Sequence, residues 1–133
     1  SDESWDAQTN VNYRSPFILA QHAARHMRER GVAGRIVNTS TVGANVCHGW
    51  TLVYDSAKAA VEAMTRNMAW ELGPAGITVN CVAPGFIATA MTEQTAARMG
   101  VPFEDFIEAV AAQTPVQRVG QPEDVAGVIA FLC

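Results

Sequence analysis

The sequence predicts an α/β fold, because strand-like apolar runs alternate with long helical patterns. Residues 34–39 form an apolar run that is typical of a buried strand. Residues 77–82 form a second such run, and the turn signal Pro84-Gly85 follows it. Between the two runs, apolar residues recur at helical spacing over 53–72. These three observations predict a strand, a helix and a second strand in that order.

The chain begins with a predicted helix over residues 5–30. Ser4 is suited to cap its N-terminus, and Gly31 is suited to end it in the left-handed conformation. Pro16 lies inside this stretch and has no backbone N–H to donate to residue 12. We therefore expect the helix to be irregular near Asn12.

The helix predicted over 53–72 ends at Gly73-Pro74 and has two apolar sides. The broader side, expected to face the core, consists of Ala57, Ala60, Val61, Met64, Met68 and Leu72. The narrower side consists of Ala59, Ala63 and Trp70. A helix with two apolar sides needs two packing partners, so the narrower side is expected to pack against something other than the sheet, such as a further part of the protein.

The remaining segments contain two more predicted helices and two loops. Residues 43–53 are rich in glycine and polar residues and are expected to border a cleft. The twenty or so residues after the second strand carry few helix or strand signals, which predicts a long functional loop. A short helix is expected over 103–112 and ends at Thr114-Pro115, and Pro122 starts the last helix.

Tyr54 and Lys58 are the candidates for chemistry, because residues four apart share one helix face. An ammonium group held beside a phenol favours the tyrosinate and turns an inert side chain into a proton donor and acceptor. At an effective dielectric of 20, a unit charge about 4 Å away supplies roughly 4 kcal/mol, but only about 1 kcal/mol in bulk water. The pair is therefore expected to work in a sheltered cleft.

Several segments, taken in order, resemble the short-chain dehydrogenase/reductase family. They are the strand before the Ser40-Thr41 hydroxyls, Tyr-x-x-x-Lys at 54–58, Asn-x-x-x-Pro-Gly-x-x-x-Thr at 80–89, and the stretch 118–126. The resemblance covers residues 5–132, and the pattern is most similar to 3-oxoacyl-carrier-protein reductases. It implies a doubly wound parallel (Rossmann-like) sheet flanked by helices, NAD or NADP as cofactor, and a homodimer or homotetramer.

The resemblance also implies roles for individual residues. Tyr54 would be the general acid/base, and Lys58 would bind the nicotinamide ribose. Asn12 matches the helix asparagine that, in the family, takes part in a proton relay to the lysine. The segment that contacts the nicotinamide and pyrophosphate is matched by Pro84, Gly85, the backbone of Ile87, and Thr89.

The hydroxyl that would orient the substrate oxygen is open between Ser40 and Thr41. The family serine lies three residues after the strand asparagine and thirteen before the tyrosine, and both spacings select Thr41. Residue identity and the Ser-x-x-Gly spacing select Ser40. We favour Ser40 at this point, because a one-residue change at a strand end is a small perturbation.

The 133 residues are expected to be the C-terminal portion of a single dinucleotide-binding oxidoreductase domain. Only two strands are evident, and no glycine-rich phosphate-binding turn follows a strand. The N-terminal glycine-rich half and the extreme C-terminus of such a domain are therefore expected to be absent, and this chain alone is expected to be inactive. The choice between NAD and NADP would depend on that missing half.

Composition excludes several other classes of protein. A net charge of −4 argues against binding nucleic acid, and no apolar run is long enough for a membrane span. Three cysteines without paired spacing indicate reduced thiols and a cytoplasmic location. His22 and His26 share a helix face but have no evident third ligand, so no metal site is predicted.

The predicted function is therefore an NAD(P)-dependent oxidoreductase that interconverts a ketone and a secondary alcohol by hydride transfer, with a small carbonyl or alcohol substrate. Enoyl reductases of the family typically separate the two residues by six positions, which disfavours that reaction. The alternative from another class is a non-catalytic dinucleotide-sensing or scaffold protein of the same fold. The residues around 90–112 contain no recognisable code for the substrate.

Overall fold

A two-stranded parallel sheet forms the centre of the chain. The computed structural model describes residues 1–47 and 49–133, so His48, inside the predicted loop 43–53, lies outside the described residues. Strand β1 (Arg35–Thr39) pairs with β2 (Thr78–Val82), in register from Arg35 beside Thr78 to Thr39 beside Val82. Helix α3 (Leu52–Leu72) connects the two strands. The predicted α/β order is confirmed.

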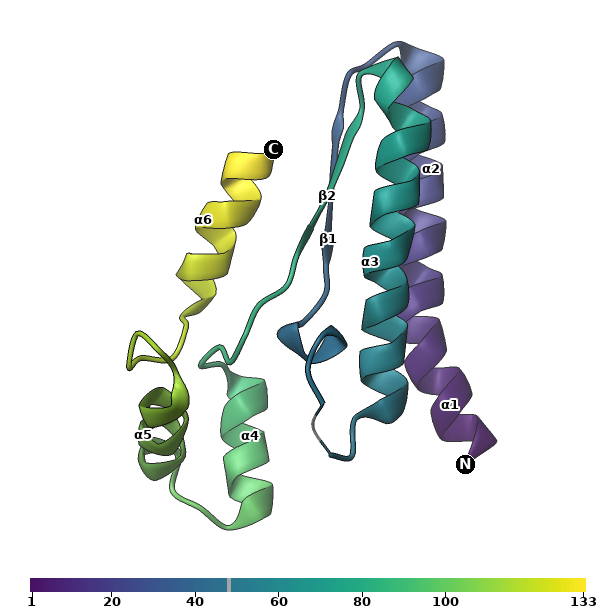
Figure 1. The fold of residues 1–133 in the computed structure, drawn as a ribbon. Coiled ribbons are helices and arrows are strands. Elements are labelled where there is room, and N and C mark those ends of the chain that lie inside the picture. The colour runs from purple at the N-terminus through teal and green to yellow at the C-terminus, as the bar shows by residue number, and fades with distance from the viewer. Residues whose placement is uncertain (48) are drawn as a thin grey trace.

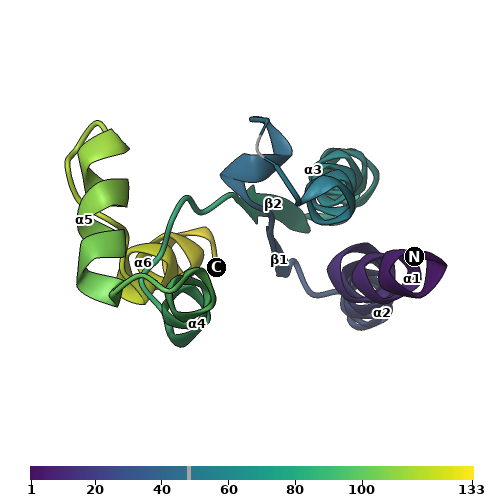
Figure 2. The same cartoon turned by 90° about the horizontal axis from the view of Figure 1, so that it is seen from below.

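Helices lie on both sides of this sheet. Figures 1 and 2 show α2 (Ser15–Arg30) beside α3 on one side, and α4 (Ala90–Met99), α5 (Phe103–Gln113) and α6 (Pro122–Leu132) on the other. A buried apolar cluster joins α2 and α3 to the strands and consists of Ala20, Ala24, Ile36, Leu72, Ile77 and Val79. The core therefore fixes both long helices against the sheet.

The first helical stretch is irregular at the place that Pro16 predicts. Helix α1 (Asp2–Thr9) and α2 are joined by a π-helical turn, Asn10–Arg14. Both the backbone N–H and the hydroxyl of Ser15 donate to the Asn10 carbonyl, the hydroxyl at 2.8 Å. A π turn shifts the hydrogen-bond pattern by one residue, which accommodates a position that lacks a donor.

The two ends of this helical stretch differ in how well the sequence predicts them. Gly31 ends α2 with φ of 63°, as expected for a left-handed glycine. The predicted cap at Ser4 is wrong, because the helix begins earlier and Ser4 lies inside α1. Ser1 is the cap, and its hydroxyl accepts the Ser4 N–H at 3.4 Å.

Helix α3 begins one residue before the predicted start and ends at the predicted residue, and its broad apolar side faces the core. Four of the expected core residues are buried, and Ala60 and Met68 are half-buried. Thr65 is also buried on this side. On the opposite side, Trp70 is 86% exposed.

The long loop predicted after β2 is wrong, because residues Ala90–Met99 form helix α4. Thr89 and Thr92 cap its start reciprocally. The Thr92 hydroxyl accepts the Thr89 N–H at 2.8 Å, and the Thr89 hydroxyl accepts the Thr92 N–H at 3.4 Å. The usual sequence signal for this box has Glu or Gln at the fourth position, so a threonine there concealed it. Helices α5 and α6 confirm the two predicted later helices.

Candidate functional site

The candidate site lies where the two parallel strands end. Beyond β1, the N–H of Ser40 donates to the Val82 carbonyl at 2.8 Å, and the N–H of Val42 donates to the Pro84 carbonyl at 3.1 Å. The segments that leave the two strands therefore stay joined. In α/β folds, ligands bind at the carboxyl ends of parallel strands. Both candidate hydroxyls and Pro84 are thus brought to this edge of the sheet.

Tyr54 and Lys58 lie in the first turns of α3, and both are half-buried. The Lys58 Nζ lies 5.7 Å from the centre of the Tyr54 ring and donates to the Thr39 carbonyl at 3.0 Å. Burial lowers the pKa of Lys58, and the nearby Cys81, where it is ionised, opposes this shift to a smaller extent. The ammonium is therefore held between the tyrosine ring and the last residue of β1, in a partly desolvated position.

The two candidate hydroxyls point into different environments. Ser40 is only 3% exposed, and its hydroxyl donates to Oε1 of Glu62 at 2.9 Å, with the Lys58 carbonyl at 3.2 Å. Thr41 is half-buried, and its hydroxyl accepts the Gly43 N–H at 3.3 Å. A hydroxyl has one hydrogen to donate. The Ser40 hydrogen is engaged inside the protein, whereas the Thr41 contact does not use the hydroxyl hydrogen.

Asn12 lies in the π-helical turn, which contacts α3. Its side-chain amide donates to the Gln8 carbonyl at 3.0 Å. This contact uses an N–H of the side chain and holds Asn12 in its own helical stretch. The structure thus places the turn that contains Asn12 in contact with α3, the helix of Tyr54 and Lys58.

The residues expected to contact the cofactor divide between two places. Pro84 is bonded to the turn after β1, as described above, and Gly85 is exposed. Ile87 and Thr89 lie farther along, at the entry to α4. A cavity of about 540 Å³ opens beside this segment and is lined by Val42, Gly85, Phe86, Ile87, Thr114 and Arg118, among others.

The segment before α4 is tied to the segment before α6, and we call this junction of residues 86–88 with Gly120 the neck. Ile87 forms a parallel bridge with Gly120, in which the Ala88 N–H donates to the Gly120 carbonyl at 2.9 Å and the Gly120 N–H donates to the Phe86 carbonyl at 3.0 Å. The Phe86 ring also meets Phe106 of α5 edge-on, with centroids 5.4 Å apart. The neck therefore joins the α4–α5 pair to the end of β2.

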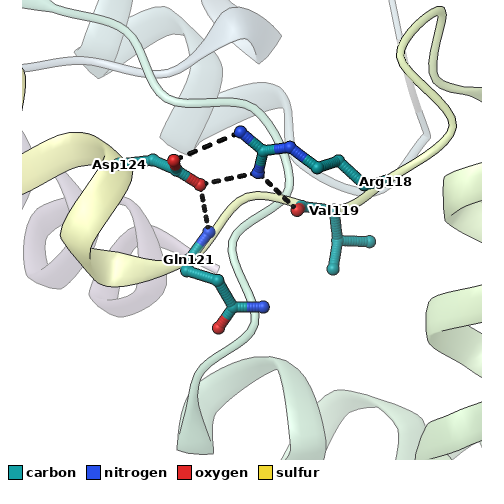
Figure 3. Close-up of polar contacts among 4 residues, drawn as sticks. All are labelled: Arg118, Val119, Gln121 and Asp124. Atoms are coloured by element: carbon teal, nitrogen blue, oxygen red, sulfur yellow. Dashed lines mark hydrogen bonds and ion pairs between the residues drawn. The ribbon is translucent and has the colours of Figure 1, made fainter.

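An ion pair joins the segment after α5 to the first turn of α6, next to the neck. Arg118 donates to both carboxylate oxygens of Asp124, at 2.8 and 3.2 Å, and Asp124 also accepts the Gln121 N–H at 2.8 Å (Figure 3). The hydrogen bond from Arg118 is the main cause that lowers the pKa of Asp124. Both side chains are largely exposed, so the pair fixes geometry more than it adds stability.

A Cβ at Gly120 would displace the tip of the Ile87 side chain and crowd the Phe86 carbonyl, which gives a first testable prediction. An added Cβ would lie 2.4 Å from Cδ1 of Ile87 and 3.2 Å from the Phe86 carbonyl oxygen. Gly120→Ala in the whole protein is expected to reduce the free energy of unfolding by about 1–3 kcal/mol. The matched control is Gly127→Ala in α6, where nothing lies within 4 Å. That change is expected to be neutral or stabilising in denaturant titrations, because alanine favours a helix more than glycine.

Sequence reasoning missed two contributors to the site, Glu62 and Asn45. The Asn45 amide donates to both carboxylate oxygens of Glu62, at 3.2 Å each. Glu62 follows Lys58 by four residues, so its place on the same helix face was a signal that could have been read. Asn45 carries no comparable pattern, because only the fold brings it to α3.

Among residues 1–47 and 49–133, no group of three or more metal-ligating side chains lies close enough together to hold a metal ion. Over the same residues, no helix combines the length and apolar character needed to cross a lipid bilayer.

Comparison with known proteins identifies the family. The profile of a family described as enoyl-(acyl carrier protein) reductase matches residues 1–133. The short-chain reductase protein NovJ of Streptomyces niveus is 40% identical over 98% of this chain and 49% of its own length. The (3R)-3-hydroxyacyl-CoA dehydrogenase of Rattus norvegicus is 39% identical over 99% and 48%, respectively.

Solved structures agree with these relatives. A variant of the actinorhodin polyketide ketoreductase with NADPH superposes with a TM-score of 0.90, at 30% identity over 99% of this chain and 52% of that one. The chain thus spans about half the length of the relatives that it matches. It belongs to the short-chain dehydrogenase/reductase family and has part of the family's Rossmann-like fold.

Proposed function

We propose that this chain is part of an NAD(P)-dependent oxidoreductase that interconverts a ketone and a secondary alcohol. The observation that carries the proposal is the arrangement of Tyr54, Lys58 and the Thr39 carbonyl at the carboxyl end of β1. A proton donor with an ammonium held beside it suits a reaction that builds negative charge on a carbonyl oxygen. The proposal depends on this arrangement of side chains, because one fold can carry many different functions.

Each residue has a defined task in the proposed reaction. Tyr54 gives its phenolic proton to the carbonyl oxygen during reduction and takes it back during oxidation. Lys58 stabilises the tyrosinate form and binds the ribose of the cofactor. A bound nicotinamide dinucleotide would supply or accept the hydride. Pro84, Gly85, Ile87 and Thr89 would hold its nicotinamide end, and Asn12 would connect Lys58 to solvent.

The structure favours Thr41 over Ser40 as the hydroxyl that orients the substrate oxygen. Ser40 is buried, and its one hydroxyl hydrogen points to Glu62 rather than toward a substrate position, which supports Thr41 in this role. Thr41 is half-buried, and its contact with Gly43 leaves the hydroxyl hydrogen unused. We therefore propose Thr41, the residue that strand spacing selects, rather than Ser40, the residue that identity selects.

Paired substitutions test this choice. Thr41→Val in the whole protein is expected to lower kcat by about 10²-fold, because the oxygen that carries developing charge loses a donor. Thr41→Ser, which keeps the hydroxyl, is expected to restore most of the activity. Ser40→Ala should instead reduce stability by about 1–3 kcal/mol, because it leaves the buried side of Glu62 without its partner. A larger loss of kcat in Ser40→Ala than in Thr41→Val would reverse the assignment.

We further propose that these residues are the C-terminal portion of a longer dinucleotide-binding domain. Within the described residues, β1 pairs only with β2, so each strand has one unpaired edge. A groove of about 400 Å³ follows β1, and another of about 460 Å³ lies beside β2. Leu19, which lines the first groove, is 70% exposed. Further strands on both sides would cover these surfaces, as a doubly wound sheet requires.

A homodimer or homotetramer in a reducing cytoplasm fits the same proposal. The exposed Trp70 on α3 would be covered by another subunit, because single large apolar side chains gain most from burial in an interface. Cys47, Cys81 and Cys133 are free thiols. Unpaired thiols are typical of proteins in reducing compartments.

A turnover assay of the whole protein tests the proposed function. Ketones, secondary alcohols and enoyl thioesters would each be offered with NAD(H) and NADP(H), and cofactor absorbance would be followed. Turnover of ketones or secondary alcohols is expected. Turnover of the enoyl thioesters alone would support the reaction in the family's description. Dinucleotide binding without any turnover would support the non-catalytic alternative.

A further inference from the structure

Polar contacts fix the position of α3 along β1. The buried Asn38 side chain donates to Thr65 at 2.9 Å, and the buried Ser40 hydroxyl donates to Glu62 at the same distance. Asn38 and Ser40 alternate along the strand, so they point to the same face of the sheet. Both partners lie on α3, about one turn apart. The helix is thereby prevented from sliding along the strand.

Glu62 also holds the loop that follows β1. Both its carboxylate oxygens accept from the Asn45 amide, while Oε1 accepts from Ser40. Between these two anchors lies the 3₁₀ turn Val42–Ala44, with Thr41 as its N-cap. The Glu62 carboxylate therefore anchors both ends of the segment 40–45, which contains Thr41.

The same helix face carries the proposed proton-transfer pair. Tyr54, Lys58 and Glu62 follow one another at intervals of four residues, which places them on one side of α3. Hydrogen bonds to a carboxylate are stronger than those between neutral groups. Hydrogen bonds to the Glu62 carboxylate thus link the turn that contains Thr41 to α3, the helix of Tyr54 and Lys58.

We propose that Glu62 is a positioning residue that holds the Thr41 hydroxyl in place relative to Tyr54 and Lys58. This inference rests on the proposed function, because it gives that hydroxyl its task. Glu62 itself touches neither substrate nor cofactor in this proposal. Its carboxylate keeps the turn at 41–45 against α3, and loss of the carboxylate releases the turn.

Variants of the whole protein separate this role from a merely structural one. Glu62→Ala is expected to lower kcat by about 10- to 100-fold, the range that a small misplacement of a reacting group produces. The dissociation constant for the cofactor should change little. Glu62→Gln keeps a carbonyl oxygen for Ser40 and is expected to restore most of kcat. Asn45→Ala, which removes only the loop anchor, should give an intermediate loss.

Glu71→Ala is the matched control, because Glu71 is an exposed glutamate on the same helix. Its kcat is expected to equal that of the unsubstituted protein. A normal kcat in Glu62→Ala would overturn the inference while leaving the proposed function intact. No turnover in the unsubstituted protein would instead count against the proposed function.

Hydrogen exchange decides the inference independently of activity. The N–H of Ala44 donates to the Thr41 carbonyl at 3.1 Å, and the N–H of Asn45 donates to the Val42 carbonyl at 3.0 Å. In Glu62→Ala both amides are expected to exchange faster, while those of β1 and β2 keep their protection. Unchanged exchange in the turn would overturn the positioning role. Faster exchange throughout the sheet would also overturn it, because Glu62 would then stabilise the fold as a whole.

Discussion

Tyr54→Phe is expected to abolish nearly all turnover of the whole protein while cofactor affinity stays within a few-fold. The phenylalanine keeps the ring beside the Lys58 ammonium, 5.7 Å from its centre in the present structure, and removes only the proton that the substrate oxygen would receive. Loss of a general acid costs about 10²- to 10⁴-fold in rate. Steady-state kinetics and a cofactor titration with the purified variant measure both quantities.

Tyr13→Phe is the control for this change, because Tyr13 is the chain's other tyrosine and is also half-buried. This change removes a phenolic hydroxyl from the π-helical turn, one that has no task in the proposed reaction, and is expected to leave kcat near the original value. Preserved turnover in Tyr54→Phe would show that another group gives the proton. A large loss in Tyr13→Phe would show that the assay responds to damage elsewhere.

Lys58→Met is expected to damage turnover and cofactor binding together. The methionine fills similar space but can neither stabilise a tyrosinate nor donate to a ribose hydroxyl. A hydrogen bond from a charged group contributes about 1.5–3 kcal/mol, so cofactor affinity should fall by about 10- to 100-fold. The rate should fall further, by about the factor expected for the acid/base.

Arg66→Met on the same helix is the control, because Arg66 is an exposed cation. This change should leave both the turnover rate and the cofactor affinity unchanged. Normal cofactor affinity in Lys58→Met would refute the ribose contact, and normal turnover would refute the support of Tyr54. Calorimetry and initial-rate measurements separate the two results.

The dependence of turnover on pH follows from the environment of Lys58. Burial lowers the pKa of this residue, and Cys81 opposes the shift only in part. The ammonium therefore loses its proton at a lower pH than an ordinary lysine. Turnover that needs the charged form should decline as pH rises through this lowered pKa. A pH–rate profile that stays flat into the ordinary lysine range would contradict this expectation.

The sequence was sufficient to predict the elements whose signals are local. The strands near 34–39 and 77–82, the helix ending at Gly73, and the irregularity near Asn12 were all readable. Periodicity, glycine and proline act on the nearest turn of the chain, so their effects can be read without knowing what packs nearby. The cap at Ser1 and the helix after Thr89 escaped, because their hydroxyl contacts lack the residues of the common pattern.

The resemblance also supplied the candidates Tyr54 and Lys58 in their order along the chain. It left the choice between Ser40 and Thr41 open, because sequence spacing and residue identity disagree there. Tertiary structure bears on that choice by directing the Ser40 hydroxyl to Glu62, a residue far along the chain. The direction in which the Ser40 hydroxyl points depends on Glu62, the partner that accepts its hydrogen, and this partner is not evident from neighbouring residues.

What the sequence by itself determined is the family, the α/β order and the pair on α3, since motifs and periodicity are properties of neighbouring residues. Only the tertiary structure placed Lys58 against the Thr39 carbonyl and brought Asn45 to Glu62. It also joined Ile87 to Gly120 at the neck. These contacts link residues that are 17 or more positions apart in the chain. They form because burial of the apolar core brings those segments together, and local pattern does not encode that approach.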